Sequence, residues 1–337
     1  MGKRVLITGI DGFVAKHCAV AFLDAGYQVR GSVLNPAWAD NARATLANFA
    51  DTSRLEFVTA DLLSDAGWDA AVDGCEVVAH VASPDPLAQP RDPDELIRPA
   101  VDGSLRVLRA SRAHEARRVV HTSSIFAAYY GRRDKTGPFD PDDWSDLDGP
   151  GITPYARSKT LAERAAREFV AEKGGPEYVS LLPGYIFGPT LDTNLSASIT
   201  LIKLLMDGKY PGAPRLCMPV VDVRDVAYAH LAAAEAPEID GGRYLLVAES
   251  KWMIDVAGDL RACAGQAGSK APRRELPDWT MRLVGLFDRP ARSVTAELGR
   301  AVRFDTSATV QDLGIRFRPA REAVCAAAQS LVELGLV

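Results

Sequence analysis

The sequence has 337 residues, of which 47% are hydrophobic and 25% are charged. These values are ordinary for a folded globular protein, and they exclude a disordered, collagen-like or disulfide-scaffold chain. The net charge of −5 is spread along the chain without a basic block, so we expect no nucleic-acid partner.

The N-terminus does not resemble a secretory signal, because Lys3 and Arg4 precede only a short apolar run that ends in glycine. No window approaches 18 consecutive apolar residues, and the sequence shows neither a myristoylation nor a prenylation motif. We therefore expect a cytoplasmic protein that does not attach to a membrane.

The first half of the chain alternates short β-branched runs with longer segments of helical period, which is typical of βαβ units and a parallel sheet. The runs are almost continuously apolar, as expected when helices cover both faces of the sheet. The expected strands are 5–7, 28–33, 55–59, 77–81, 119–122 and 178–182, and the clearest helices are 13–25, 96–113 and 154–171. We predict an α/β fold with a Rossmann-type, doubly wound parallel sheet.

The second half of the chain has a different sequence pattern. Residues 131–153 are rich in glycine, proline and aspartate, which predicts a surface loop beside a pocket. A helix is expected near 196–206, and beyond residue 251 helical segments are interrupted by prolines. We predict a dinucleotide-binding domain over residues 1–183. Residues 184–337 would be mainly a smaller, C-terminal substrate-binding lobe, part of which returns to the sheet.

The cysteines and histidines do not form a recognisable framework. The five cysteines are odd in number and widely separated, so we expect buried apolar thiols rather than disulfides. The histidines show no metal-ligand spacing, and we expect no metal site. The cysteines are Cys18, Cys75, Cys217, Cys263 and Cys325.

A glycine-rich turn follows the first expected strand and opens the first expected helix, at residues 8–15. In Rossmann folds this position binds the pyrophosphate of a dinucleotide. Gly9 can make the tight turn, Gly12 allows the backbone to approach the phosphates, and the helix N-terminus supplies free N–H donors. A plain strand-to-helix turn is the alternative, and the βαβ setting favours the cofactor site.

Two later segments carry groups suited to acid–base chemistry. Ser124 follows the expected strand 119–122, and Tyr155 and Lys159 lie four residues apart on an expected helix, so their side chains share one helix face. A neighbouring ammonium favours the ionised form of a phenol, which lets such a pair exchange a proton near neutral pH. Taken singly, Ser124 could be a serine in a turn, and Tyr155 and Lys159 could be a solvated pair on a helix surface. Their order after a glycine turn favours a catalytic site.

A glycine turn, then serine at a strand end, then Tyr-x-x-x-Lys is the arrangement of the short-chain dehydrogenase/reductase superfamily, and the chain resembles its extended branch. More closely, it is similar to the group of dihydroflavonol reductases, cinnamoyl-CoA reductases and methylglyoxal or ketone reductases. The likeness extends to about residue 250 and more loosely beyond. Besides the motifs above, it rests on residues 26–31, 60–62, 79–84, 182–184, 188–189 and 221–226.

The resemblance implies reduction of an aldehyde or ketone, reversible as alcohol oxidation, in which Tyr155 donates a proton while the nicotinamide delivers hydride. Lys159 would also bind the nicotinamide ribose, and Ser124 would hydrogen-bond the carbonyl oxygen as negative charge builds on it. Phe126 and Tyr185 would contact a substrate with an apolar or aromatic substituent. The partner is therefore a small carbonyl or alcohol molecule, and the chain would be a monomer or a homodimer.

The resemblance and the motif positions also predict the cofactor contacts. Asp61 falls where the family meets the adenine, although an aspartate there could equally cap a helix. Asp222 and Arg224 are better interpreted as a helix cap and an ion pair. The predicted cofactor-binding residues are Thr8, Gly9, Gly12, Phe13, Val14, Arg30, Asp61, Leu62, Val81, Ala82, Ser83, Thr122, Tyr155, Lys159, Pro183 and Ile186.

The choice between NAD(H) and NADP(H) is not clearly encoded. Plant-type members of the group carry an arginine just beyond the second strand, which grips the 2′-phosphate of NADPH, and the matching residue here is Leu34. Val33 does not supply the acidic residue that would favour NADH. Arg30 either reaches the phosphate or forms an ion pair within the fold. We predict that both coenzymes work, with weak discrimination.

Other functions compete with carbonyl reduction. A hydroxysteroid dehydrogenase needs the same serine, tyrosine and lysine, so it stays open. A sugar-nucleotide dehydratase places an acidic pair just after the catalytic serine or threonine, whereas Ser124 is followed by Ile125 and Phe126. A redox-sensing binding protein would keep the glycine turn and lose the tyrosine, whereas this chain has both Tyr155 and Lys159.

Overall fold

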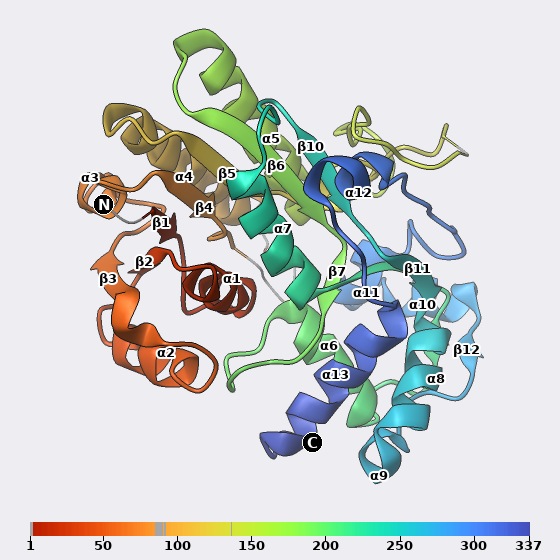
Figure 1. Cartoon of the computed structure of the whole chain (residues 1–337). Coiled ribbons are helices and arrows are strands. Elements are labelled where there is room, and N and C mark those ends of the chain that lie inside the picture. The colour runs from red at the N-terminus through yellow and green to blue at the C-terminus, as the bar shows by residue number, and fades with distance from the viewer. Residues whose placement is uncertain (1–2, 85–89, 91, 136) are drawn as a thin grey trace.

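The computed structural model describes residues 3–84, 90, 92–135 and 137–337 (Figure 1). Within these residues, seven parallel strands form one sheet in the order β10-β6-β5-β4-β1-β2-β3. They are β1 (Arg4–Ile7), β2 (Gln28–Val33), β3 (Leu55–Thr59), β4 (Val77–His80), β5 (Arg118–Thr122), β6 (Glu177–Pro183) and β10 (Arg243–Leu246). The predicted parallel α/β sheet is confirmed.

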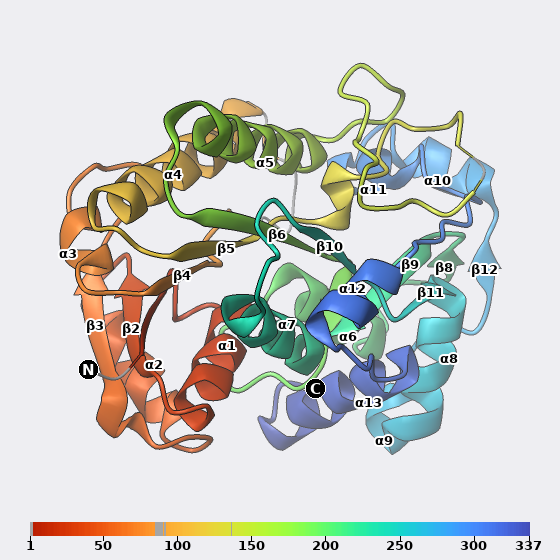
Figure 2. The ribbon, with the colours of Figure 1, turned by 45° about the horizontal axis from the view of Figure 1, so that its top comes forward.

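Helices cover both faces of this sheet, as the apolar strands predicted (Figure 2). On one face lie α3 (Trp68–Val72), α4 (Asp94–Ala113) and α5 (Pro154–Lys173), and on the other lie α1 (Phe13–Asp24) and α7 (Val223–Glu235). Along β1, Val5 and Ile7 enter the core beneath α1 and α7, whereas Leu6 enters the core beneath α4. No helix within the described part of the chain is long and apolar enough to cross a membrane.

A smaller lobe adjoins the sheet. It contains a three-stranded sheet in the order β11-β9-β7 and a parallel pair of β8 with β12. These strands are β7 (Tyr185–Phe187), β8 (Ala213–Pro214), β9 (Cys217–Asp222), β11 (Glu249–Trp252) and β12 (Glu275–Leu276). Its helices include α6 (Ala197–Met206), α8 (Met253–Cys263), α9 (Gly265–Gly268), α10 (Asp278–Val284), α11 (Arg289–Val294) and α13 (Ala320–Glu333). The domain division at residue 183 stays a prediction, although β10 does carry the second half of the chain back to the large sheet.

The remaining elements are short. The described residues of the loop predicted over 131–153, namely 131–135 and 137–153, are irregular in the structure. The loop is held where Phe139 N–H donates to the Arg303 carbonyl at 2.8 Å and Asp305 N–H donates to the Phe139 carbonyl at 2.7 Å. Several of the short elements are not expected from the sequence. These are α2 (Trp38–Leu46), α12 (Ser307–Leu313), and the 3-10 turns η1 (Thr52–Arg54) and η2 (Ile125–Ala127).

The cysteine prediction is wrong for two residues. Cys18, Cys75 and Cys217 are buried free thiols, as expected, and burial raises the pKa of each. Cys263 and Cys325 instead form a disulfide. The reason is that α8 and α13 pack side by side and bring the two Cα atoms to 5.8 Å.

Candidate active site

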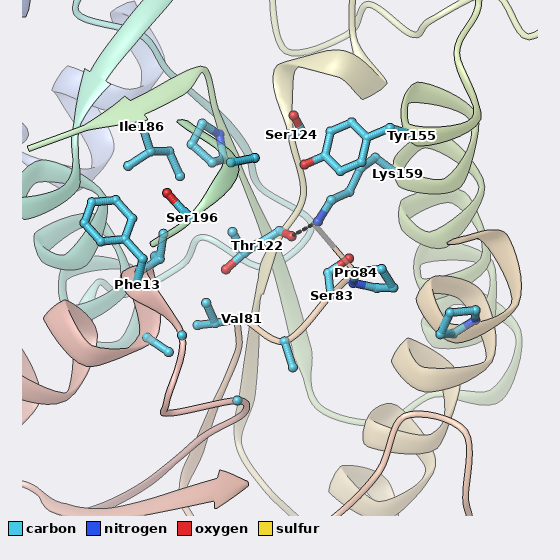
Figure 3. A pocket seen from close by; sticks show the side chains of 18 of the residues that line it. Phe13, Val81, Ser83, Pro84, Thr122, Ser124, Tyr155, Lys159, Ile186 and Ser196 are labelled. Carbon is cyan, nitrogen blue, oxygen red and sulfur yellow. Dashed lines mark hydrogen bonds between the residues drawn. The ribbon is translucent and has the colours of Figure 1, made fainter. Parts of the chain in front are cut away.

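One cavity of about 720 Å³ lies at the carboxyl ends of the large sheet's strands. Residues that follow β1, β2, β3, β4, β5 and β6 line one side, and α6 and α11 of the smaller lobe line the other. Open α/β sheets bind ligands in this place. Figure 3 shows the cavity with side chains from both parts pointing into it.

The glycine turn lies at the cavity wall. Gly9 has a positive φ of 64°, and a Cβ there would lie 3.1 Å from the Cβ of Ala82, so the position suits glycine. Gly9 N–H donates to Ser32 Oγ at 3.0 Å, which joins the turn to β2. The helix α1 then begins at Phe13 without a side-chain cap. Its first turn therefore presents backbone N–H donors to the cavity, as a phosphate requires.

The cavity extends past the end of β2, and we call this part the β2 end. Asp61 Oδ1 accepts from Leu63 N–H at 2.9 Å, so its carboxylate is used in a turn while the residue still lines the cavity. Half-exposed apolar side chains line this end of the cavity, with Leu34, Trp38 and Leu63 at 54%, 44% and 61% exposure. This surface suits an adenine ring better than a phosphate.

Arg30 is the clearest correction to the predicted site. Its guanidinium pairs with Glu56 at 2.7 Å and donates to the carbonyls of Ala70, Ala71 and Asp73 at the end of α3. It does not line the cavity. Arg30 lies three residues before the end of β2, roughly 10 Å short of the cavity edge at about 3.3 Å per residue. Of the two roles predicted for Arg30, the structure shows the ion pair.

Thr8 is a second correction. It is fully buried and does not line the cavity. Its Oγ1 accepts from the N–H groups of Val81 and Ala82 at 3.0 and 2.9 Å and bonds His80 Nδ1 at 3.0 Å. The hydroxyl thus fixes the segment after β4, so Thr8 shapes the cavity wall from behind it.

Ser124, Tyr155 and Lys159 converge at the opposite part of the cavity, which we call the β5 end (Figure 3). Thr153 caps α5 by accepting from Ala156 N–H at 3.1 Å, which places Tyr155 in the first turn and Lys159 one turn later. Lys159 Nζ lies 5.8 Å from the Tyr155 ring centroid and donates to the Thr122 carbonyl at 3.3 Å. The predicted serine, tyrosine and lysine therefore share one surface.

Ser124 and Lys159 are nearly buried, at 4% and 5% exposure. Ser124 Oγ accepts from Phe126 N–H at 3.3 Å, so its own hydrogen can donate to an oxygen in the cavity. A hydroxyl, a phenol and an ammonium at one buried surface can donate protons to an oxygen and stabilise negative charge on it.

Aromatic rings form the wall beside these groups. Phe126 lies at centroid distances of 4.9 Å from Tyr130, 5.6 Å from Tyr155 and 5.8 Å from Tyr185. Burial raises the pKa of both Tyr130 and Tyr185, so these two phenols are neutral. Phe126 and Tyr185, the two predicted substrate residues, both line the cavity, as does Tyr130.

Most of the other predicted residues also reach the cavity. Those that line it are Gly12, Phe13, Val14, Leu62, Val81, Ala82, Ser83, Thr122, Pro183 and Ile186. The residues that sequence reasoning missed come mainly from the smaller lobe, where no motif marks them, and Trp38 could have been found from its place just after β2. They include Trp38, Ser196, Ala197, Ser198, Leu201, Ser293 and Val294.

Several polar residues outside the cavity have structural roles. Asp222 caps α7 by accepting from Arg224 N–H at 2.8 Å and also pairs with the Arg224 guanidinium at 2.7 Å, as predicted. His121 is buried and bonds Tyr178 Oη through Nδ1 at 2.6 Å. Across the described ranges, no group of three or more His, Cys, Asp or Glu is arranged to hold a metal ion.

The cavity residues fit a nicotinamide dinucleotide. The turn at Gly9 and Gly12 and the uncapped start of α1 offer N–H donors for the pyrophosphate. The apolar β2 end suits the adenine, and Lys159 at the β5 end can bind ribose hydroxyls. The coenzyme would supply the hydride, and the groups at the β5 end would supply the proton.

Comparisons with known proteins agree with this geometry. Residues 5–247 match the model of the "NAD dependent epimerase/dehydratase family". The chain is 32% identical to cinnamoyl-CoA reductase 2 of Arabidopsis thaliana over 99% of this chain and 94% of that enzyme. The structure is similar to yeast methylglyoxal/isovaleraldehyde reductase Gre2 complexed with NADPH, with a TM-score of 0.81, 25% identity, and coverage of 99% and 100%. It is also similar to vestitone reductase from alfalfa (Medicago sativa L.), with a TM-score of 0.74, 26% identity and full coverage of both chains.

Proposed function

This chain belongs to the NAD dependent epimerase/dehydratase family, and we propose that it reduces the carbonyl group of an uncharged, apolar aldehyde or ketone. Its relatives along the whole chain are reductases, so it is an NAD(P)H-dependent oxidoreductase of the extended short-chain dehydrogenase/reductase group. The substrate class, the roles of individual residues and the coenzyme preference form the proposal.

The observation that carries the proposal is the convergence of Ser124, Tyr155 and Lys159 at one end of a cavity whose other end suits a dinucleotide. Reduction adds hydride to the carbonyl carbon and a proton to the carbonyl oxygen, which gives an alcohol. Bound NAD(P)H supplies the hydride. Tyr155 Oη–H gives the proton, and the Lys159 ammonium stabilises the phenolate that remains.

Ser124 acts on the same oxygen. Because its Oγ accepts from Phe126 N–H, its hydrogen is directed away from that bond and can donate to the carbonyl oxygen as negative charge develops there. The serine thus serves electrostatic stabilisation. In the reverse direction the Tyr155 phenolate takes the proton of an alcohol.

The lining of the β5 end supports an uncharged substrate. Phe126, Tyr130 and Tyr185 present aromatic surface. Among the lining residues that the structure describes, Lys159 is the sole cation, and its Nζ lies 5.8 Å from the Tyr155 ring centroid. A CoA thioester or a sugar nucleotide brings phosphates, which proteins usually bind with arginine or lysine. An aryl or alkyl carbonyl compound needs no such partner.

The same lining disfavours epimerase or dehydratase chemistry. Where a dehydratase would carry an acidic pair, this chain has the fully buried Ile125 and the aromatic Phe126. The described carboxylates of the cavity are Asp11 and Asp61, which lie with the glycine turn and the β2 end. Acid–base elimination would lack its groups at the β5 end.

The β2 end supports weak discrimination between NADH and NADPH. Arg30 is held by Glu56, and Arg43 donates to the carbonyls of Thr52 and Leu55 at 3.1 and 2.8 Å. Both nearby guanidinium groups are therefore used within the fold. Leu34 and Trp38 offer neither a positive charge for the 2′-phosphate nor a carboxylate for the free 2′-hydroxyl.

The test follows the absorbance of NADH or NADPH with the purified protein and a panel of matched carbonyl compounds. Benzaldehyde and 4-carboxybenzaldehyde differ by one negative charge, so a higher kcat/KM for benzaldehyde is expected. A ketosteroid and a CoA thioester extend the panel, and interconversion of nucleotide sugars is followed separately. Binding of coenzyme with turnover of nucleotide sugars alone would overturn the proposal.

A further inference from the structure

His230 is a buried histidine on the far side of the sheet from α5. It lies on α7, whereas Tyr155 and Lys159 lie on α5, and these helices cover opposite faces of the sheet (Figure 2). It is fully buried, and burial lowers its pKa to about 4, so the ring is neutral near pH 7. The proposed mechanism gives it no role.

The hydrogen bonds of His230 define its tautomer. Nδ1 lies 2.8 Å from the carbonyl oxygen of Val226, which can only accept, so Nδ1 carries the hydrogen. In the neutral ring Nε2 is then an acceptor, and the Thr122 hydroxyl, 2.7 Å away, donates to it. His230 therefore holds the Thr122 side chain with one specific tautomer.

Thr122 joins the two faces of the sheet. It is the last residue of β5, where its side chain reaches α7 and its carbonyl accepts from Lys159 Nζ at 3.3 Å. Figure 3 shows this bond at the floor of the cavity, below Tyr155. Thr122, whose carbonyl accepts from the ammonium, is thus itself held from the opposite helix layer.

We propose that His230 is a positioning residue for the carbonyl reduction, because it holds Thr122 so that the Thr122 carbonyl keeps Lys159 beside Tyr155. This inference rests on the proposed function of that site. Misplacing a catalytic group by about 1 Å can cost roughly 100-fold in rate. Because only two hydrogen bonds join His230, Thr122 and Lys159, losing one of them can displace Lys159 enough to lower the rate.

The other titratable groups around Lys159 do not compete for this role. His80 on β4 and His121 on β5 stack with ring centroids 5.0 Å apart. Burial, helped by the charge of Lys159, lowers the pKa of His80 to about 3 and that of His121 well below its usual value. Both rings are neutral over the working range, so Lys159 is the positive charge that acts on Tyr155 from this group.

The experiment compares Thr122→Val, His230→Leu and His230→Gln. The valine keeps the shape of threonine and removes the hydroxyl, and the glutamine can offer its side-chain oxygen near the place of Nε2. We expect kcat to fall about 10- to 100-fold in Thr122→Val and His230→Leu, with partial recovery in His230→Gln. The double variant Thr122→Val/His230→Leu should be no worse than either single change, because both remove the same link.

A second readout distinguishes positioning from stability and does not need turnover. Ultraviolet titration, with Tyr155→Phe as the reference, reports ionisation of the Tyr155 phenol. Ionisation should move to higher pH by roughly one unit in Thr122→Val, since the ammonium is held less closely. Thr309→Val is the matched control: Thr309 is buried and donates to the Leu245 carbonyl at 2.8 Å, away from the cavity. It should lower thermal stability and leave both readouts unchanged.

The outcomes separate the two proposals. If the wild type reduces no carbonyl compound, the proposed function fails, and the titration still tests the link between His230, Thr122 and Lys159. Thr122→Val with wild-type kcat and unchanged Tyr155 ionisation would overturn the inference, as would equal losses in Thr309→Val. Should His230→Leu fail to fold, Thr122→Val and His230→Gln decide the question.

Discussion

The two ends of the cavity differ in how far their side chains are buried. At the β5 end Lys159 and Ser124 are 5% and 4% exposed, and each forms a hydrogen bond with a main-chain group. At the β2 end Leu34 and Trp38 are 54% and 44% exposed. The β5 end holds its polar groups in fixed places, as acid–base chemistry requires. The β2 end holds apolar surface without a fixed positive charge. The two ends thus differ in what they can discriminate.

This difference follows from how each end is built. The β5 end is made by a strand end, η2 and the first turns of α5, with Thr122 bonded from both faces of the sheet. At the β2 end the nearby basic side chains, Arg30 and Arg43, bind main-chain carbonyls and leave the surface without a positive charge. We expect substitutions at the β5 end to change turnover, and those at the β2 end to change coenzyme affinity.

The largest effect is expected for Tyr155→Phe. The change removes the proton donor and keeps the ring that packs against Phe126, so kcat should fall about 10²- to 10⁴-fold. The Kd of NADH, measured by fluorescence titration, should stay within about twofold. A purified variant that keeps most carbonyl-reducing activity would remove Tyr155 from the role of acid.

Ser124→Ala should have the next largest effect. Loss of one hydrogen-bond donor to a developing oxyanion typically lowers kcat about 10²- to 10³-fold, with little change in KM for the coenzyme. Ser123→Ala is a neighbouring control: Ser123 also lines the cavity, but its hydroxyl donates to the buried Glu163 at 2.5 Å. Equal kinetic losses in both variants would indicate a structural role for Ser124.

The sequence predicted which side chains meet at the β5 end, because the signals there lie at the ends of strands and helices. The order of the glycine turn, Ser124 and Tyr-x-x-x-Lys is carried by strand and helix ends, and βαβ topology brings those ends together. The strands were recognisable because burial on both faces leaves nearly continuous apolar runs. No three-dimensional detail was needed for either inference.

The failures all depend on tertiary packing. The role of Arg30 depends on the direction in which its side chain leaves β2, and this side chain faces the carbonyl end of α3. The disulfide between Cys263 and Cys325 could not be predicted, because the two residues are 62 positions apart in the chain and meet only where α8 packs on α13. The cavity residues on α6 and α11 come from segments without a motif, so the sequence alone does not place them.

A third prediction changes the β2 end. Leu34→Arg places a guanidinium beside the expected 2′-phosphate, and a hydrogen bond to a charged group is worth about 1.5 to 3 kcal/mol. The KM for NADPH should fall roughly 10- to 100-fold while the KM for NADH stays nearly constant. Leu34→Gln is the uncharged control of similar length. A wild type that already prefers NADPH strongly, unaffected by Leu34→Arg, would mean that another residue holds the phosphate.

The smallest kinetic effect is expected for Arg30→Gln, and it tests whether the β2 end truly lacks a positive charge for the coenzyme. Because the guanidinium binds Glu56 and three carbonyls at the end of α3, its loss should lower the free energy of unfolding by about 1 to 3 kcal/mol. The KM values of NADH and NADPH should each change less than about twofold. Chemical denaturation measures the first quantity, and initial rates measure the second. A tenfold rise in the KM of NADPH alone would return Arg30 to the phosphate site, because a residue that only supports α3 affects both coenzymes equally.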